Sequence, residues 1–142
     1  MLIDINVLLY ASISSFPEHQ AARAWLDRQL SGSARVGFPW MTVLGYLRLA
    51  TNGRLFSPQI AMATAWQRVS AWLACDAAWI PQPTERHAEV LGTLLARPGV
   101  YGNLVPDAHL AALAIEHGLT LCSTDGDFAR FPGLRWENPL SP

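Results

Sequence analysis

Short apolar runs alternate along the chain with longer segments in which apolar residues recur at helical spacing. Between residues 18 and 30, for example, Ala22, Trp25 and Leu26 fall on one face of a predicted helix. Strands are predicted within residues 1–5, 31–38, 77–83, 120–125 and 134–139. Helices are predicted over residues 6–12, 18–30, 40–52, 59–73, 84–96 and 106–118.

This alternation of strands with helices predicts an α/β protein with a mainly parallel central sheet. No linker, internal repeat or low-complexity segment interrupts the pattern, so we expect one domain over residues 1–142. In this architecture ligands bind beyond the carboxyl ends of the strands, where the strand order reverses. The residues that follow each predicted strand are therefore the first places to look for chemistry.

Composition and charge restrict the class of protein that this sequence can encode. Hydrophobic residues make up 51% of the 142 residues, but no apolar run is long enough to span a membrane. Cys75 and Cys122 have neither metal-binding nor redox spacing, so we interpret both as core thiols of a cytoplasmic protein. The net charge of −1 gives no general attraction to nucleic acid. All basic residues are arginines, which suit phosphate recognition, although a GC-rich coding sequence gives the same bias.

Four of the six aspartates lie at predicted element ends. Asp4 ends the first strand, and Asp107 follows Pro106 at a helix start. Asp125 and Asp127 follow the apolar stretch TLCST, which begins the strand predicted within residues 120–125. Each has an ordinary structural explanation. Asp is a favoured helix cap, it interacts well with the dipole in a first helical turn, and Asp and Gly are common in turns.

Together these carboxylates indicate a site. Two lie at the ends of predicted parallel strands, and their convergence without basic partners would cause strong repulsion. A hard cation such as Mg²⁺ or Mn²⁺, which takes oxygen ligands, removes that repulsion and suits metal-assisted phosphodiester hydrolysis. The histidines show no metal-ligand or catalytic spacing, and we interpret all four as surface or core residues: His19, His87, His109 and His117.

Four stretches, taken in order, make a family resemblance visible. They are LIDINVLLY at the start, YLRLATN in the middle, PDAHLAALA later and STDGDFARFPGLRWENPL at the end. The chain resembles the PIN-domain ribonucleases and, among them, the VapC-type toxins of toxin–antitoxin pairs. The resemblance implies a three-layer α/β/α sandwich and an acidic Mg²⁺ site, with Mn²⁺ as the alternative ion, that cleaves RNA.

The resemblance also implies roles for individual residues. Asp4, Asp107 and Asp125 correspond to catalytic and metal-binding carboxylates, and Asp127 to a further acid of the same metal site. Asn6 and Thr124 would orient these carboxylates. Arg48 and Arg130 would contact RNA phosphates or acidic groups of an antitoxin, although each also suits a solvated helix face. The implied partners are an RNA substrate, a cognate antitoxin and a second copy of the chain.

One position departs from the family pattern. The resemblance implies a glutamate about one helical turn before Arg48, but that position is Gly45, and no carboxylate lies between Asp27 and Asp76. Three interpretations follow: water fills the position, the Thr42 hydroxyl serves there, or the nuclease is impaired. The first interpretation gives a Mg²⁺-dependent endoribonuclease toxin. The last gives a catalytically weakened domain that mainly binds RNA or an antitoxin.

Overall fold

The five predicted strands pair into one sheet in the computed structural model, which describes residues 1–142. The order is β3-β2-β1-β4-β5, and every neighbouring pair is parallel. The order reverses between β1 and β4, where the register pairs Leu2 with Leu121 and Ile3 with Cys122. The strands are β1 (Leu2–Ile3), β2 (Val36–Gly37), β3 (Ala78–Trp79), β4 (Thr120–Cys122) and β5 (Arg135–Glu137).

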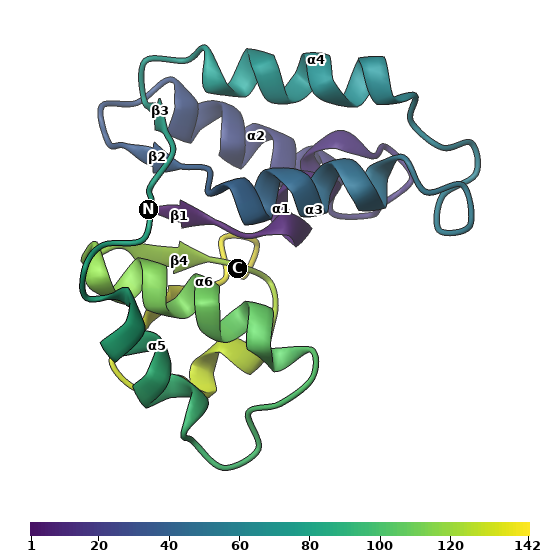
Figure 1. Cartoon of the computed structure of the whole chain (residues 1–142). Helices are drawn as coiled ribbons and strands as arrows, with labels where there is room; N and C mark the ends of the chain where they lie inside the picture. Colours follow the sequence, from purple (N-terminus) through teal and green to yellow (C-terminus); the bar gives the residue numbers. More distant parts are fainter.

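Six helices cover the two faces of this sheet. Figure 1 shows the first four helices on one side of β1 and β4 and the last two on the other side. No helix is both long and apolar enough to cross a membrane. The helices are α1 (Ile5–Ser12), α2 (His19–Leu30), α3 (Trp40–Ala50), α4 (Met62–Leu73), α5 (His87–Leu95) and α6 (Leu104–Glu116).

Side-chain alternation along the short central strands separates two hydrophobic cores. Ile3 and Cys122 belong to the core beneath α1–α4, whereas Leu2 and Leu121 belong to the core beneath α5 and α6. Successive residues of a strand point to opposite faces, so each two- or three-residue strand contributes to both cores. The predicted three-layer α/β/α sandwich with a parallel sheet is confirmed.

Helix α6 lies against the sheet through very small side chains. Ala108, Ala111, Ala112 and Ala114 are fully buried there. Alanine combines high helix propensity with minimal bulk, so the backbone of α6 can approach the sheet closely. This close seating fixes the position of the first turns of α6, which carry Asp107.

Several boundaries differ from the predictions. Helix α4 begins at Met62 and α5 begins at His87, each a few residues later than predicted. Helix α6 begins at Leu104, so Pro106 lies inside its first turn, where a missing N–H costs no helical hydrogen bond. A 3₁₀ helix over Gly126–Arg130 was not predicted. Both cysteines are free thiols, with Cys122 buried and Cys75 partly exposed.

Two buried hydroxyls on α3 differ in their bonding. Thr42 has no exposed surface, and its hydroxyl donates a hydrogen bond of 3.0 Å to the Ile3 carbonyl. Tyr46 is equally buried, but its hydroxyl has no hydrogen-bond partner. Removing one partner of a buried bond leaves the other unsatisfied, whereas removing an unpartnered polar group leaves nothing unsatisfied.

We therefore expect opposite effects from two conservative substitutions. Thr42→Val should lower the free energy of unfolding by about 1–2 kcal/mol because the Ile3 carbonyl loses a donor. Tyr46→Phe should leave it unchanged or raise it by up to about 1 kcal/mol. Urea denaturation of both variants against the parent protein tests this, and equal destabilisation by the two would contradict it.

Candidate metal centre at the carboxyl ends of β1 and β4

The site is built where β1 and β4 end side by side. Asp4 directly follows β1, and its backbone N–H donates a hydrogen bond of 3.1 Å to the carbonyl of Cys122, the last residue of β4. Ser123 comes next in the chain after β4. This is the point where the strand order reverses, so the predicted location is the one at which the polar residues gather.

Asp4 is both a helix cap and part of this cluster. One carboxylate oxygen, Oδ1, accepts a hydrogen bond of 2.7 Å from the N–H of Ile5 at the start of α1. The other oxygen, Oδ2, accepts one of 2.7 Å from the Ser123 hydroxyl. Burial raises the pKa of Asp4 above its usual value, although these two hydrogen bonds oppose the shift. Capping and site chemistry are therefore compatible roles of one side chain.

Ser123 connects the polar groups of the site and was not among the predicted residues. It is fully buried, and while its hydroxyl donates to Asp4 it accepts from Asn6 Nδ2 at 3.0 Å and from the Asp125 N–H at 3.0 Å. Asn6 Oδ1 in turn accepts from the Thr124 N–H at 3.3 Å. Ser123 and Thr124 are adjacent residues that both carry a hydroxyl. Because successive residues of an extended segment point to opposite sides, only the Ser123 hydroxyl contacts Asp4. Thr124 contributes its backbone N–H.

Asp125 and Asp127 belong to the turn that follows β4. Asp125 caps the 3₁₀ helix, where its Oδ1 accepts a hydrogen bond of 2.9 Å from the Asp127 N–H. Asp127 is more exposed and forms an ion pair of 3.2 Å with Arg130. The turn chemistry expected of this stretch is present, and it holds one carboxylate beside Ser123 and another at the surface.

Asp107 approaches the same region from α6. Its pKa is raised to about 6, first by burial and then by the negative charges of Asp4, Asp125 and Asp127. Arg130 acts in the opposite direction. Four acids from three separate segments therefore influence one another electrostatically.

These oxygen donors suit a hard divalent cation chemically. The excess of negative charge that raises the pKa of Asp107 is what such an ion would neutralise. No three His, Cys, Asp or Glu side chains of the chain are close enough together to enclose an ion already. The arrangement is an open acidic cluster that offers carboxylates from different elements.

Gly45 on α3 packs directly against Ile5 on α1. A Cβ atom at this position would overlap Ile5 Cδ1 and lie 3.0 Å from Ile5 Cγ1. The space that a side chain at residue 45 would need is thus filled by Ile5. Thr42, one turn earlier, is wholly buried and donates its hydroxyl hydrogen to the Ile3 carbonyl.

The two predicted arginine contacts lie at the surface. Arg130 is paired with Asp127, and its side chain retains 42% exposure. Arg48 is exposed on α3 and takes part in none of the ion pairs of the chain. Both are accessible to a partner.

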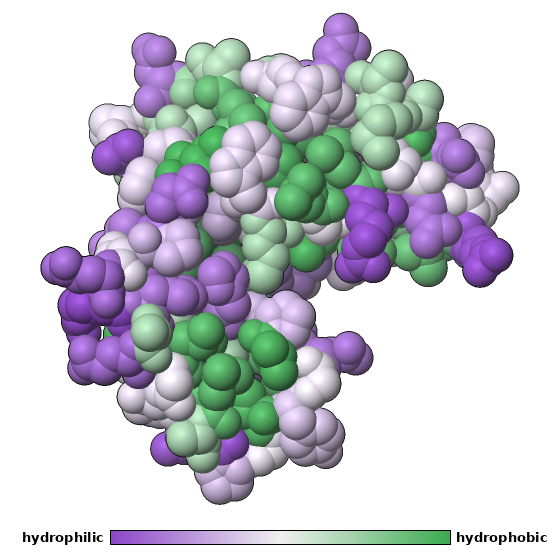
Figure 2. Space-filling view, viewed as in Figure 1, coloured by the Kyte–Doolittle hydropathy of each residue, from purple (hydrophilic) through white to green (hydrophobic).

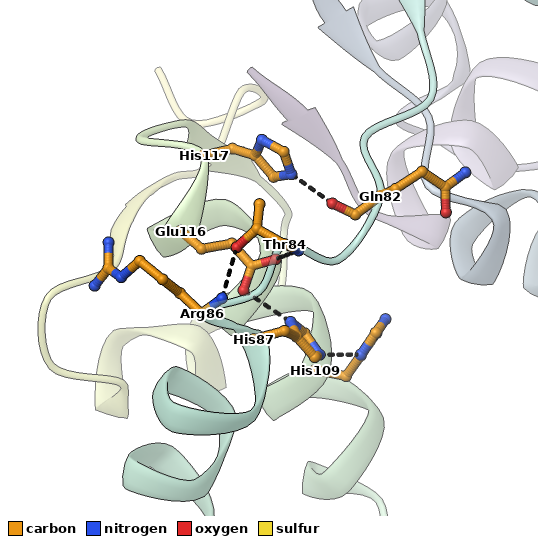
Figure 3. Close-up of polar contacts among 7 residues, drawn as sticks. All are labelled: Gln82, Thr84, Arg86, His87, His109, Glu116 and His117. Atoms are coloured by element: carbon orange, nitrogen blue, oxygen red, sulfur yellow. Dashed lines mark hydrogen bonds and ion pairs between the residues drawn. The ribbon is translucent and has the colours of Figure 1, made fainter.

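Two of the histidines have contacts that no sequence spacing indicated. His109 lies two residues after Asp107, yet it meets His87 instead of the acids, with 3.0 Å between His109 Nδ1 and His87 Nε2. Glu116 lies on the other side of His87 (Figure 3). His87 on α5 is 22 residues from His109 and 29 residues from Glu116, both on α6, so only the packing of α5 on α6 brings His87 to them.

Comparisons with known proteins show the family to which the chain belongs. The PIN domain family model matches residues 1–134, and the chain belongs to the PIN domain family. Ribonuclease VapC37 of Mycobacterium tuberculosis is 46% identical over 138 residues, which cover 97% of this chain and 96% of the relative. Ribonuclease VapC43 of the same species is 39% identical over 99% of this chain and 95% of its own length.

Solved structures share the fold at lower identity. VapBC2 from Rickettsia felis, bound to a DNA fragment from its promoter, aligns with a TM-score of 0.70 at 19% identity and covers 96% of each chain. FitAcB from Neisseria gonorrhoeae aligns with a TM-score of 0.63 at 21% identity, over 97% of this chain and 96% of that chain. The resemblance to PIN-domain proteins seen in the sequence is confirmed.

Repulsion among the acids predicts a pH-dependent stability difference. The folded state holds the pKa of Asp107 at about 6, above its ordinary value of 3.8, so folding favours the protonated form. The stabilisation that protonated Asp107 contributes to the folded state is fully present below about pH 4 and is lost as the pH rises through about 6. In the absence of divalent ions, Asp107→Asn should therefore have a higher Tm than the parent at pH 7.5 but not at pH 4.

Thermal unfolding in EDTA across this pH range measures the difference. Asp27→Asn is the matched control, because Asp27 lies on the exposed face of α2 in a loose pair with Arg23. A Tm difference for Asp107→Asn that does not change with pH, or that matches the control, would contradict the electrostatic account.

Proposed function

We propose that this chain is a Mg²⁺-dependent endoribonuclease and the toxin of a toxin–antitoxin pair. One observation supports the proposal: Ser123 joins Asp4 to the Asp125 segment at the ends of β1 and β4, and the negative charges of Asp4, Asp125 and Asp127 help to raise the pKa of Asp107 to about 6. The ribonuclease names of relatives that match nearly the whole chain support the same activity. Mn²⁺ has the same ligand preference and is the alternative ion.

In this proposal Asp4, Asp107 and Asp125 hold the ion, and Asp127 is a further acid at its exposed side. When bound, the ion would supply positive charge at the scissile phosphate and lower the pKa of a water molecule, so that this water can lose a proton and attack the phosphate. Hydrolysis would leave a 5′-phosphate and a 3′-hydroxyl. The hydrogen bonds of Ser123 and the Ile5 N–H fix both Asp4 oxygens, so this carboxylate is oriented before substrate arrives.

Asn6 and Thr124 have supporting positions in this scheme. Asn6 donates to the Ser123 hydroxyl and accepts from the Thr124 N–H, which ties the start of α1 to the segment after β4. Arg48 and Arg130 are proposed to contact RNA phosphates or antitoxin carboxylates, since both side chains are exposed. Arginine donors suit either anion.

The same proposal includes protein partners and a cytoplasmic location. The names VapBC2 and FitAB of similar structures support an antitoxin partner. Apolar side chains gather over α3 and α4 in Figure 2, where Leu44 is 60% and Trp66 is 46% exposed, and this surface supports a homodimer. The free thiols suit a reducing compartment.

A catalytically weakened domain is the second candidate. The observation that favours it is the Ile5–Gly45 contact, because Ile5 occupies the space that an additional carboxylate would enter from α3. Such a domain would mainly bind RNA or an antitoxin.

RNA cleavage tests the leading proposal directly. Total cellular RNA should be cut by the parent protein with Mg²⁺ and not with EDTA, and Asp4→Asn should abolish cutting. Ser123→Ala should lower the rate by about 10–100-fold, because Asp4 loses the hydroxyl that orients it. Asp27→Asn, which removes an exposed acid far from the cluster, should cut like the parent. Cleavage that survives both EDTA and Asp4→Asn would refute the proposal.

Because Gly45 packs against Ile5, an additional acid at position 45 requires a smaller residue at position 5. Gly45→Glu alone should lower the free energy of unfolding by about 1–3 kcal/mol, because its Cβ overlaps Ile5. In Ile5→Ala/Gly45→Glu the overlap is relieved, and half-maximal cleavage should need about tenfold less Mg²⁺ than in Ile5→Ala/Gly45→Gln.

The glutamine variant is matched in shape and differs only in charge. Cleavage rates measured against Mg²⁺ concentration distinguish the candidates. If the two double variants depend on Mg²⁺ equally while the parent cuts RNA readily, a missing acid never limited the site and the weakened candidate loses its basis.

A further inference from the structure

A second polar cluster lies away from the acids, between α5 and α6. His87 is the first residue of α5, and His109 and Glu116 lie on α6. Figure 3 shows the three side chains in a row, with His87 in the middle. His109 is two residues beyond Asp107, which is about 200° around the helix. This cluster therefore faces away from the acidic site.

The contacts in this row fix the orientation of His87. The buried Glu116 carboxylate accepts the Thr84 N–H at 2.8 Å through Oε1 and meets His87 Nδ1 at 2.9 Å through Oε2. The carboxylate holds the proton on His87 Nδ1, so Nε2 carries no proton and accepts a hydrogen bond from His109 Nδ1. A carboxylate behind a histidine in this way is the usual support of a metal-binding imidazole.

The unprotonated nitrogen of His87, Nε2, is hydrogen-bonded to a second imidazole nitrogen. His87 Nε2 and His109 Nδ1 are 3.0 Å apart, and the two rings meet at 73°. An ion bound at about 2.0–2.1 Å separates two nitrogens by about 2.9 Å at a right angle and by about 3.3 Å at the tetrahedral angle. An ion would replace the proton that the two nitrogens share, and each ring would turn by roughly 40° to direct its lone pair at the ion.

The charge balance of the cluster also favours a cation. Glu116 has no exposed side-chain surface, and the only basic group within ion-pair distance is His87. A buried carboxylate is costly without a compensating positive charge. The His87 side chain retains 14% exposure.

We propose that His87 and His109 form a binding site for a nitrogen-preferring divalent ion of the Zn²⁺ type, supported from behind by Glu116. No third His, Cys, Asp or Glu completes the site, so water fills the remaining positions. The ion joins α5 to α6 and is separate from the oxygen-ligated ion proposed for the acids, because imidazole suits Zn²⁺ and carboxylate suits Mg²⁺.

Calorimetric titration of the full, untagged chain with Zn²⁺ in millimolar Mg²⁺ tests this proposal. One Zn²⁺ should bind, and binding should persist in Asp4→Asn. Affinity should fall by more than tenfold in His87→Gln and in His109→Gln, and by about 10–100-fold in Glu116→Gln. His19→Gln is the matched control, because His19 contacts only the Tyr10 carbonyl. It should bind like the parent.

A spectroscopic measurement on the parent protein keeps the test valid if a variant fails to fold. Cu²⁺ bound at this site should show coupling to two imidazole nitrogens by electron paramagnetic resonance. Zn²⁺ should also raise the Tm of the parent but not of His109→Gln, since only the folded state brings the two rings together. Absence of two-nitrogen coupling, or Zn²⁺ affinity unchanged in folded His87→Gln and His109→Gln, would overturn the proposal.

Discussion

The parallel pairing of β1 with β4 is the constraint on which the rest of the structure depends. Its register sets Ile3 opposite Cys122, so the residues that follow each strand, Asp4 and Ser123, emerge side by side. The 2.7 Å hydrogen bond between them then joins two segments that are 119 residues apart. A shift of one residue would reverse which side chains face each core and would separate the two polar groups.

The sequence allowed the fold to be predicted because periodicity reports burial directly. All five strands and six helices were expected, since each buries a stripe or face of apolar residues. The starts of α4, α5 and α6 were less predictable, because first turns lack internal hydrogen bonds and depend on local contacts. The grouping of Asp4, Asp107, Asp125 and Asp127 was expected from the strand ends together with the family resemblance, and the negative charges of the other three help to raise the pKa of Asp107.

Other features of the sites depend on contacts between distant residues, which produce no recognisable pattern in the sequence. Ser123 and Thr124 are chemically similar neighbours, and only the strand geometry shows which hydroxyl contacts Asp4. The meeting of His87 with His109 depends on how α5 packs on α6. The absence of an acid at Gly45 was visible in the sequence, but its packing against Ile5 was not. Pairings across elements are decided by tertiary packing, which a single sequence does not record.

The alanine surface of α6 limits how this protein can diverge. Helix α6 buries Leu110 and Leu113 together with four alanines, and a larger residue at one of the alanine positions forces the packed layers apart. Such a shift would carry Asp107 away from Asp4. Substitutions would therefore accumulate in the surface loops, while α6 changes slowly. The smallest side chains of the protein are then among its least replaceable.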